Sequence, residues 1–196
     1  MYELKLATRS FLSKQFAGQK SIFFQPVIRS LTQVLFTALF LFFSTSPGHS
    51  EDVQQWAQKQ STQLTQLYES LHRTPELSNE EEKTAARMAQ LMGEIGLKVT
   101  PPGGGHGVVA VLENGKGKTL LLRADMDALP VVEETGLAYA SQVKMLDKRG
   151  ATVGVMHACG HDMHMTNLIG TVQYLASHRQ QWQGTLVAIF QPAEEL

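Results

Sequence analysis

Residues 119–130 read Thr-Leu-Leu-Leu-Arg-Ala-Asp-Met-Asp-Ala-Leu-Pro, an apolar run that ends in two carboxylates and a proline. The continuous apolar character of 119–122 is typical of a strand that is covered on both faces. A second run of this kind, 185–190, is also followed by acids, at 194 and 195. Helical patterns alternate with these runs, which predicts an α/β layered domain. Ligand sites in open α/β sheets collect beyond the strand ends, so both acidic pairs are candidates for a functional site.

Apolar residues at helical spacing extend from residue 51 to a break before Pro75. The break is expected because the residue before a proline disfavours the α region. Ser78 and Glu81 have capping-box spacing, which predicts that Ser78 caps the helix that follows. Asp162 is a favourable N-cap for a further helix with a clear apolar stripe.

Residues 108–112 have the apolar, β-branched character of a strand. The Asn-Gly turn within 114–117 predicts a hairpin that joins this strand to 119–122. Residues 141–155 are polar, and we expect them to form an irregular surface excursion.

The formal net charge of the chain is −1, so no basic excess points to a nucleic-acid partner. The charge is unevenly spread, because the first fifty residues are basic and the remainder is acidic. A basic head on an acidic body is the asymmetry of a targeting segment.

Residues 34–43 form an apolar run that is too short to span a bilayer, which needs about 17 apolar residues or more. The run fits the apolar core of a secretory signal peptide, and Gly48-His49-Ser50 offers a cleavage site before Glu51. We therefore expect 1–50 to be a signal peptide with a long basic head. The mature protein would be exported to the periplasm or the medium, without a stable membrane span. The alternatives are a buried core helix or a retained membrane anchor.

The segment His157-Ala-Cys-Gly-His-Asp-Met-His164 concentrates three imidazoles, the single cysteine of the chain and a carboxylate. Thiolate and imidazole are good ligands for zinc, and imidazole also suits manganese, nickel and cobalt. A single cysteine cannot form an internal disulfide, so Cys159 needs another explanation in an exported protein. Metal binding by Cys159 and His161 is one, and a small buried hydrophobe among unrelated polar loop residues is the other.

The two acidic pairs allow a similar choice. Asp125 and Asp127 would point to the same side of a strand, where paired acids can bind a metal or orient a ligand histidine. The alternative is an acidic turn with Arg123 as its counter-ion. Adjacent Glu194 and Glu195 point apart, so one could bind metal while the other acts as a base for hydrolysis. The alternative is a charged helix start.

Four strings in order carry a resemblance to one family: LHRTPELSNEE, LLRADMDALPVVEETG, MHACGHDMHMTNLIGT and GTLVAIFQPAEE. They resemble the metallopeptidase family of aminoacylases and carboxypeptidase-G-like enzymes. Within it they are most similar to the branch of hippurate hydrolases, N-acyl-amino-acid amidohydrolases and auxin-conjugate amidohydrolases. The resemblance extends over nearly all of residues 64–195.

The resemblance implies that Cys159, His161 and Glu195 are metal ligands for one or two divalent ions, zinc, manganese, nickel or cobalt. It implies that Glu194 is the general base and that Asp127 orients the metal centre. The implied activity is metal-dependent hydrolysis of the amide bond of N-acyl amino acids or small peptides. A structural zinc module is a weaker interpretation, because such modules usually use several cysteines.

The resemblance also implies a three-layer α/β/α catalytic domain, of which 51–196 would be the N-terminal part. Relatives continue with two further ligand histidines and an inserted lid or dimerisation domain, so we expect a homodimer only in a full-length relative. Asp125 falls where other branches of the family have a ligand histidine, and a contact of Asp125 or His164 with the metal stays open. The alternative function is an inactive truncated fragment or pseudo-enzyme with an incomplete metal site.

Overall fold

The computed structural model describes residues 52–100 and 105–196. The signal peptide expected over 1–50 lies outside the described residues. Within the described ranges, every helix is too short or too polar to cross a membrane.

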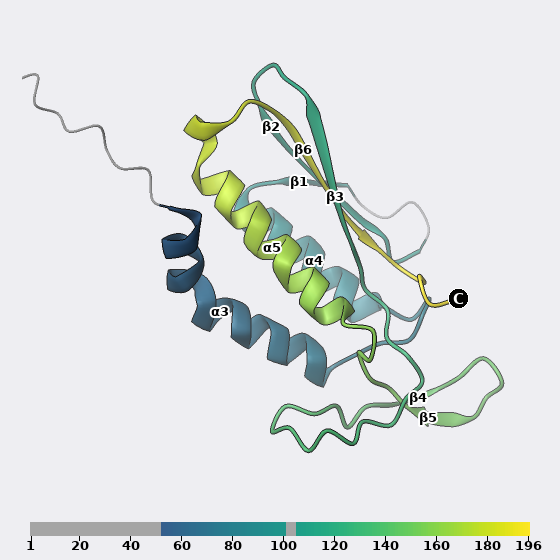
Figure 1. Cartoon of the computed structure of the whole chain (residues 1–196). Coiled ribbons are helices and arrows are strands. Elements are labelled where there is room, and N and C mark those ends of the chain that lie inside the picture. The colour runs from purple at the N-terminus through teal and green to yellow at the C-terminus, as the bar shows by residue number, and fades with distance from the viewer. Residues whose placement is uncertain (1–51, 101–104) are drawn as a thin grey trace, which may run out of the picture. The chain divides into compact units, whose positions relative to one another are not determined.

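The described residues form a four-stranded mixed sheet with the strand order β1-β2-β6-β3 (Figure 1). Strand β1 (Lys98–Thr100) pairs antiparallel with β2 (Val108–Asn114). Strand β6 (Gly184–Gln191) pairs antiparallel with β2 and parallel with β3 (Thr119–Asp125). The predicted α/β class is confirmed, and the predicted strands at 108–112 and 185–190 lie within β2 and β6.

The predicted hairpin between β2 and β3 is wrong, because β6 lies between these two strands. The chain does turn at Gly115 (φ 80°), but the two strands separate enough for a third to bond to both. Strand β6 enters this gap where the backbone N–H of Thr185 donates to the carbonyl of Lys118 at 3.0 Å. A glycine is needed here, since Gly184 has φ 130° and a Cβ atom would lie 2.2 Å from the Lys118 oxygen. The sequence at 114–117 correctly predicts a turn, but which strands pair depends on β6, which lies far along the chain.

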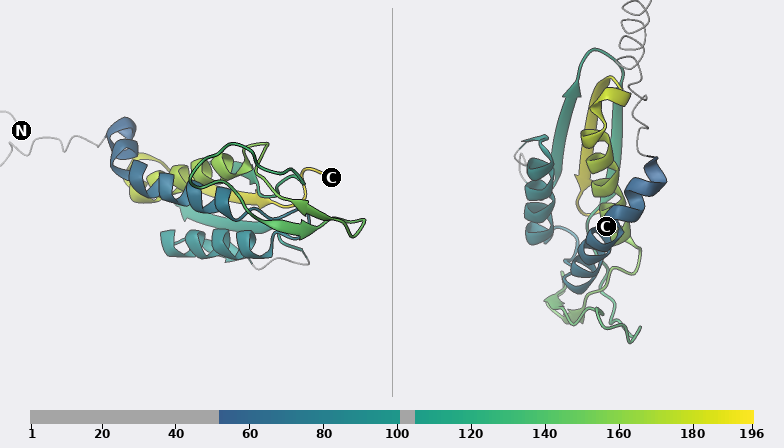
Figure 2. Two further views of the ribbon diagram at one scale, coloured as in Figure 1. Left: turned by 90° about the horizontal axis from the view of Figure 1, so that it is seen from below. Right: turned by 90° about the vertical axis from the view of Figure 1, so that its left-hand side faces the viewer.

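Helices α4 (Glu82–Ile95) and α5 (His161–Ser177) lie side by side on one face of the sheet (Figures 1 and 2). Helix α3 (Val53–Arg73) packs against α5, and a short 3₁₀ turn, Arg179–Gln181, leads into β6. One core joins the buried side chains of the covered sheet face with those of the helices: Val108, Ala110, Leu112, Leu186, Ala188 and Phe190 from strands, and Met88, Met92, Met165, Ile169 and Val172 from helices.

The other face of the sheet is more accessible in the described structure. Its β2 and β6 side chains, Val109, Val111, Val187 and Ile189, are only partly buried. Strand β3 is at the sheet edge, where Leu120 and Leu121 are 51% and 54% exposed. The prediction that 119–122 is covered on both faces is therefore wrong for the described residues, which supply helices to one face.

The predicted cap at Ser78 is also wrong. Helix α4 starts at Glu82 without a side-chain cap, and the Ser78 hydroxyl instead donates to Asp127. The carboxylate of Glu76 accepts the backbone N–H groups of Lys83 and Thr84, so it satisfies the first turn of the helix.

Asp162 does not cap α5 either. Gly160, in the left-handed conformation with φ 85°, precedes the helix, and Asp162 lies buried in its first turn. Its carboxylate contacts His72 at the end of α3. Both residues predicted as caps instead bond to a residue distant in sequence: Ser78 to Asp127 and Asp162 to His72.

Residues 141–155 are more regular than predicted. Strands β4 (Lys144–Leu146) and β5 (Thr152–Gly154) form a separate antiparallel pair. A small second core holds the pair to the domain and consists of Leu77, Ala128 and Val155, with partly buried Val143, Met145 and Val153 packed against it.

Candidate metal centre

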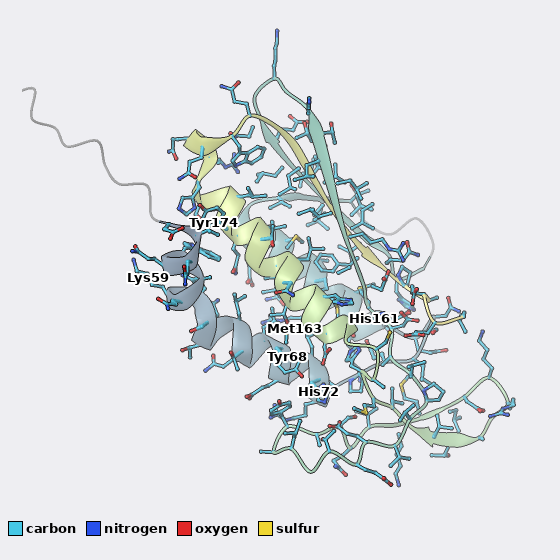
Figure 3. All side chains as sticks on the ribbon, in the orientation of Figure 1. Lys59, Tyr68, His72, His161, Met163 and Tyr174 are labelled. Atoms are coloured by element: carbon cyan, nitrogen blue, oxygen red, sulfur yellow. The ribbon has the colours of Figure 1, made fainter. Side chains whose placement is uncertain are left out.

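Three loops meet where β3 and β6 end. The parallel pairing places Asp125 opposite Gln191, and the Met126 N–H donates to the Gln191 carbonyl at 2.9 Å. The loop before α5 completes the edge, with His161 at the first turn of that helix (Figure 3). Both acidic pairs and the histidine-rich segment therefore come from the ends of elements that share one edge of the sheet.

His161 is buried and its ring is fixed by one hydrogen bond. Its Nδ1 lies 2.9 Å from the backbone carbonyl of Asp127, which is only an acceptor, so Nδ1 carries the proton. The Nε2 atom is then unprotonated, and its lone pair is available to a metal ion. It faces the carboxylates of Glu194 at 3.7 Å and Glu195 at 3.9 Å. This arrangement is the one that metal-ligating histidines use.

Asp127 is buried and joins the loops. Its Oδ2 accepts from the Ser78 hydroxyl at 2.6 Å and from the backbone N–H of Glu195 at 2.8 Å. Burial raises the pKa of Asp127, but these hydrogen bonds outweigh burial and hold the pKa below its ordinary value. Asp127 thus orients His161 through its backbone carbonyl and the glutamate pair through its carboxylate.

The three ligands implied by the sequence come together. Ligand atoms of Cys159, His161 and Glu195 all lie within 4.8 Å of one another. Cys159 is exposed, and the hydrogen bond and charge of neighbouring Glu195 raise the pKa of its thiol. The charge of Glu195 therefore disfavours the thiolate of Cys159, whereas a cation between the two groups would favour it.

A second set shares His161 with the first. Ligand atoms of Asp125, His161 and Glu194 also lie within 4.8 Å of one another. Asp125 is held by Arg123, whose guanidinium donates to Oδ1 at 2.6 and 2.8 Å. His164 is exposed, its ring is tilted by 38° against that of His161 at a centroid distance of 5.8 Å, and it is in neither of these sets.

Comparison with known proteins identifies the family. The model of peptidase family M20/M25/M40 matches residues 121–196, the stretch that contains both candidate ligand sets. The chain belongs to this family. Hippurate hydrolase of Campylobacter jejuni is 43% identical over 134 residues, which are 68% of this chain and 32% of that protein. IAA-amino acid hydrolase ILR1-like 2 of Arabidopsis thaliana is 37% identical over 85% of this chain and 38% of its own length.

A solved M20 structure shares the fold of this chain. The YXEP protein of Bacillus subtilis, described as a dinuclear metal binding peptidase from the M20 family, is 37% identical and superposes with a TM-score of 0.63. The match covers 70% of this chain and 37% of that one. This M20 chain thus spans about a third of the length of the curated relatives it matches.

Near the candidate metal site, the structure shows buried polar residues for which the sequence predicts no role in the site. His72 is buried between two carboxylates, with Nδ1 2.6 Å from Asp162 and Nε2 3.0 Å from Glu133. Burial lowers the pKa of His72, but the two carboxylates outweigh it and raise the pKa above its ordinary value. This cluster ties α3 to the residue that follows His161.

His157 and Glu81 are two further buried residues, and the capping box with Ser78 is the only role that the sequence predicts for Glu81. His157 is buried, and neither ring nitrogen has a hydrogen-bond partner among the described residues. Burial lowers the pKa of His157 to about 4, so it is neutral at pH 7. Glu81 is fully buried and reaches the loop after β6. The signal for Glu81 and His72 was their presence in the string LHRTPELSNEE, which carried the family resemblance but no assigned chemistry.

Proposed function

We propose that the complete protein is a metal-dependent amidohydrolase, in which Cys159, His161 and Glu195 bind a divalent ion. The observation that carries the proposal is the convergence of their ligand atoms within 4.8 Å at one sheet edge. The names of the relatives, a hippurate hydrolase and an amino acid conjugate hydrolase among them, support a linear amide as the substrate.

The donor atoms fit a divalent ion. Glu195 Oε1 is buried without a hydrogen-bond partner among the described residues, and it lies 3.9 Å from His161 Nε2. A buried, unsatisfied carboxylate oxygen is costly, and a cation at this edge would remove the cost. One thiolate, one imidazole and carboxylates suit zinc, and they also accept cobalt, nickel or manganese. The second set, Asp125, His161 and Glu194, supports a site for one or two ions.

Such an ion would supply Lewis acidity, which acidifies water and polarises a carbonyl oxygen. The chain itself supplies the proton transfer. Glu194 is 41% exposed, so its carboxylate can face a substrate while lying 3.7 Å from His161 Nε2. We propose that a Glu194 carboxylate oxygen accepts the proton of the attacking water and then donates it to the leaving amine. Asp127 keeps His161 and the Glu195 backbone in place throughout.

The test is hydrolysis by the full-length gene product. After loading with zinc, manganese, cobalt or nickel, it should release free amino acid from N-acyl amino acids, with hippurate as the first substrate. A chelator should abolish release, and added metal should restore it. Metal binding by a folded full-length protein without turnover on any linear amide would favour the non-enzyme alternative.

We also propose that residues 1–50 direct export, on the strength of the basic head, the apolar run 34–43 and Gly48-His49-Ser50. N-terminal sequencing of the mature protein should then begin near Glu51. An intact Met1 on protein recovered from the cytosol would contradict this proposal.

A further inference from the structure

The backbone on either side of Glu194 is held by two buried carboxylates that come from different parts of the chain. The Ala193 N–H donates to Glu81 Oε1 at 2.7 Å, across 112 residues of sequence. The Glu195 N–H donates to Asp127 Oδ2 at 2.8 Å, across 68 residues. Alternate amides are thus fixed, and the side chain of Glu194 extends between them.

The conformation of Ala193 shows why such a hold is needed. Its φ is 56°, in the left-handed region that residues other than glycine seldom adopt. Such a conformation persists where its surroundings over-determine it. Strand β6 ends at Gln191, so this turn at 193 directs the glutamate pair toward His161.

Glu81 has no other evident task in the described structure. It precedes α4, yet its side chain makes no capping hydrogen bond to that helix. It has no measurable exposure, whereas its neighbours Glu80 and Glu82 are exposed. Burying a carboxylate is costly, and Oε2 has no hydrogen-bond partner among the described residues. The contact that accounts for its burial is the one to Ala193.

We propose that Glu81 is a positioning residue, which fixes the backbone at Ala193 and thereby sets the direction of Glu194 and Glu195. The consequence for metal binding rests on the function proposed above. Removal of Glu81 leaves every proposed ligand in the chain but releases the segment that carries two of the site carboxylates.

The first measurement is amide hydrogen exchange at 193 and 195 in the full chain. Glu81→Met keeps a side chain of similar length without an acceptor, and Glu81→Asp keeps the charge but shortens the reach. Both variants should accelerate exchange at Ala193 by about ten-fold or more, the equivalent of one hydrogen bond to a charged group. Exchange at Glu195, which Asp127 holds, should stay at the parent rate. Glu81→Gln retains an acceptor and should restore most of the protection.

The second measurement is the affinity for Co²⁺, followed by titration of the same proteins. Loss of an outer partner of a metal ligand typically costs about 10- to 100-fold in affinity, and Glu81→Met and Glu81→Asp should fall in this range. Glu81→Gln should rescue affinity to within about three-fold, as expected for a neutral acceptor in place of a charged one. Glu82→Met, an exposed change on the same helix, is the matched control and should bind as the parent does.

Parent-like protection of Ala193 in both Glu81→Met and Glu81→Asp would overturn the proposal. Parent-like Co²⁺ affinity in a variant that has lost this protection would overturn it as well. If the parent itself binds no Co²⁺, the proposed metal function fails. The exchange rate at Ala193 then tests the role of Glu81 alone, because the hydrogen bond from Ala193 to Glu81 does not require a bound metal. Because Glu81→Gln is the most conservative of the three substitutions, it still tests the proposal if the other two variants fail to fold.

Discussion

Two buried histidines lie on either side of Asp162, and their surroundings differ in kind. His72 lies at the end of α3 (Figure 3) and has a carboxylate at each ring nitrogen, Asp162 at 2.6 Å and Glu133 at 3.0 Å. His161 has one fixed nitrogen, bonded to the Asp127 carbonyl, and one that faces a cluster of carboxylates at 3.7 Å or more. The two residues are similarly buried, at 5% and 3% exposure, so burial alone does not distinguish them.

The difference lies in what remains unsatisfied. Around His72 every nitrogen has its acceptor, and the cluster needs no further atom. Around His161 the Oε1 atom of Glu195 is buried without a hydrogen-bond partner among the described residues, and it lies 3.9 Å from the free Nε2. A completed polar cluster stabilises a fold, whereas an incomplete one with converging donors is a binding site. His72 is therefore expected to matter for stability and His161 for metal and chemistry.

The largest effect is expected on the His161 side. In the full-length protein, Glu194→Gln should lower kcat by about 10²–10⁴-fold, because the amide cannot accept the proton that a general base removes. The ion at Cys159, His161 and Glu195 should stay bound, since Glu194 is assigned to the proton and not to this ligand set. Steady-state kinetics with metal analysis checks both. A variant within a few-fold of the parent rate would assign the base elsewhere.

On the other side, His72→Leu should destabilise the fold. It leaves Asp162 and Glu133 as buried charges without their partner, and breaking a buried pair in this way costs about 3–5 kcal/mol. Urea unfolding of the full chain measures the loss, with exposed Arg73→Leu as the control of the same helix end. If His72→Leu unfolds at the same urea midpoint as the parent, the cluster of His72, Asp162 and Glu133 does not stabilise the fold. The contrast with His161 would then be wrong.

The contribution of His72 to the free energy of unfolding should depend on pH. The pKa of His72 is raised in the folded state, so its charged form stabilises the fold fully below the unfolded pKa of about 6.5. That contribution is lost as the pH rises through the folded pKa. The difference in unfolding free energy between the parent and His72→Gln should therefore be largest near pH 6 and smaller at alkaline pH. A difference that grows with pH would contradict the charged assignment.

The smallest effect is expected for Asp125→Asn. Its carboxylate already has a partner in Arg123, and both side chains are partly exposed. Because Asp125 is outside the set of Cys159, His161 and Glu195, the change should alter zinc affinity by only a few-fold, and loss of this exposed ion pair should cost about 0–1 kcal/mol of stability. Isothermal titration with zinc would measure this. A loss as large as that for Cys159→Ala would make Asp125 a ligand equal to the first set and enlarge the open cluster around His161.

Sequence analysis located the elements whose signals are local. The strands at 108–112 and 185–190, the break before Pro75 and the apolar stripe of α5 all depend on neighbouring residues. The five residues assigned to the site, Asp127, Cys159, His161, Glu194 and Glu195, also lie at one sheet edge, because each adjoins the end of a strand or the start of a helix.

The features that were missed depend on distant partners. Strand β6 separates β2 from β3, although only a turn lies between those two in sequence. Ser78 and Asp162 have good capping chemistry, but Asp127 and His72 compete for the same atoms from 49 and 90 residues away. The role of Glu81 depends on Ala193, 112 residues later. No spacing rule within a window of one helix can identify such pairs.

The central claim is that Cys159, His161 and Glu195 bind one ion at the edge where β3 and β6 end. X-ray absorption of the zinc-loaded chain tests it most directly, because Cys159 is the only cysteine. The parent should show one sulfur scatterer at about 2.3 Å from zinc, with nitrogen and oxygen scatterers at about 2.0–2.2 Å. Cys159→Ala should lose the sulfur scatterer and most of its bound zinc. A parent spectrum without sulfur, or an unchanged zinc content in Cys159→Ala, would contradict the account.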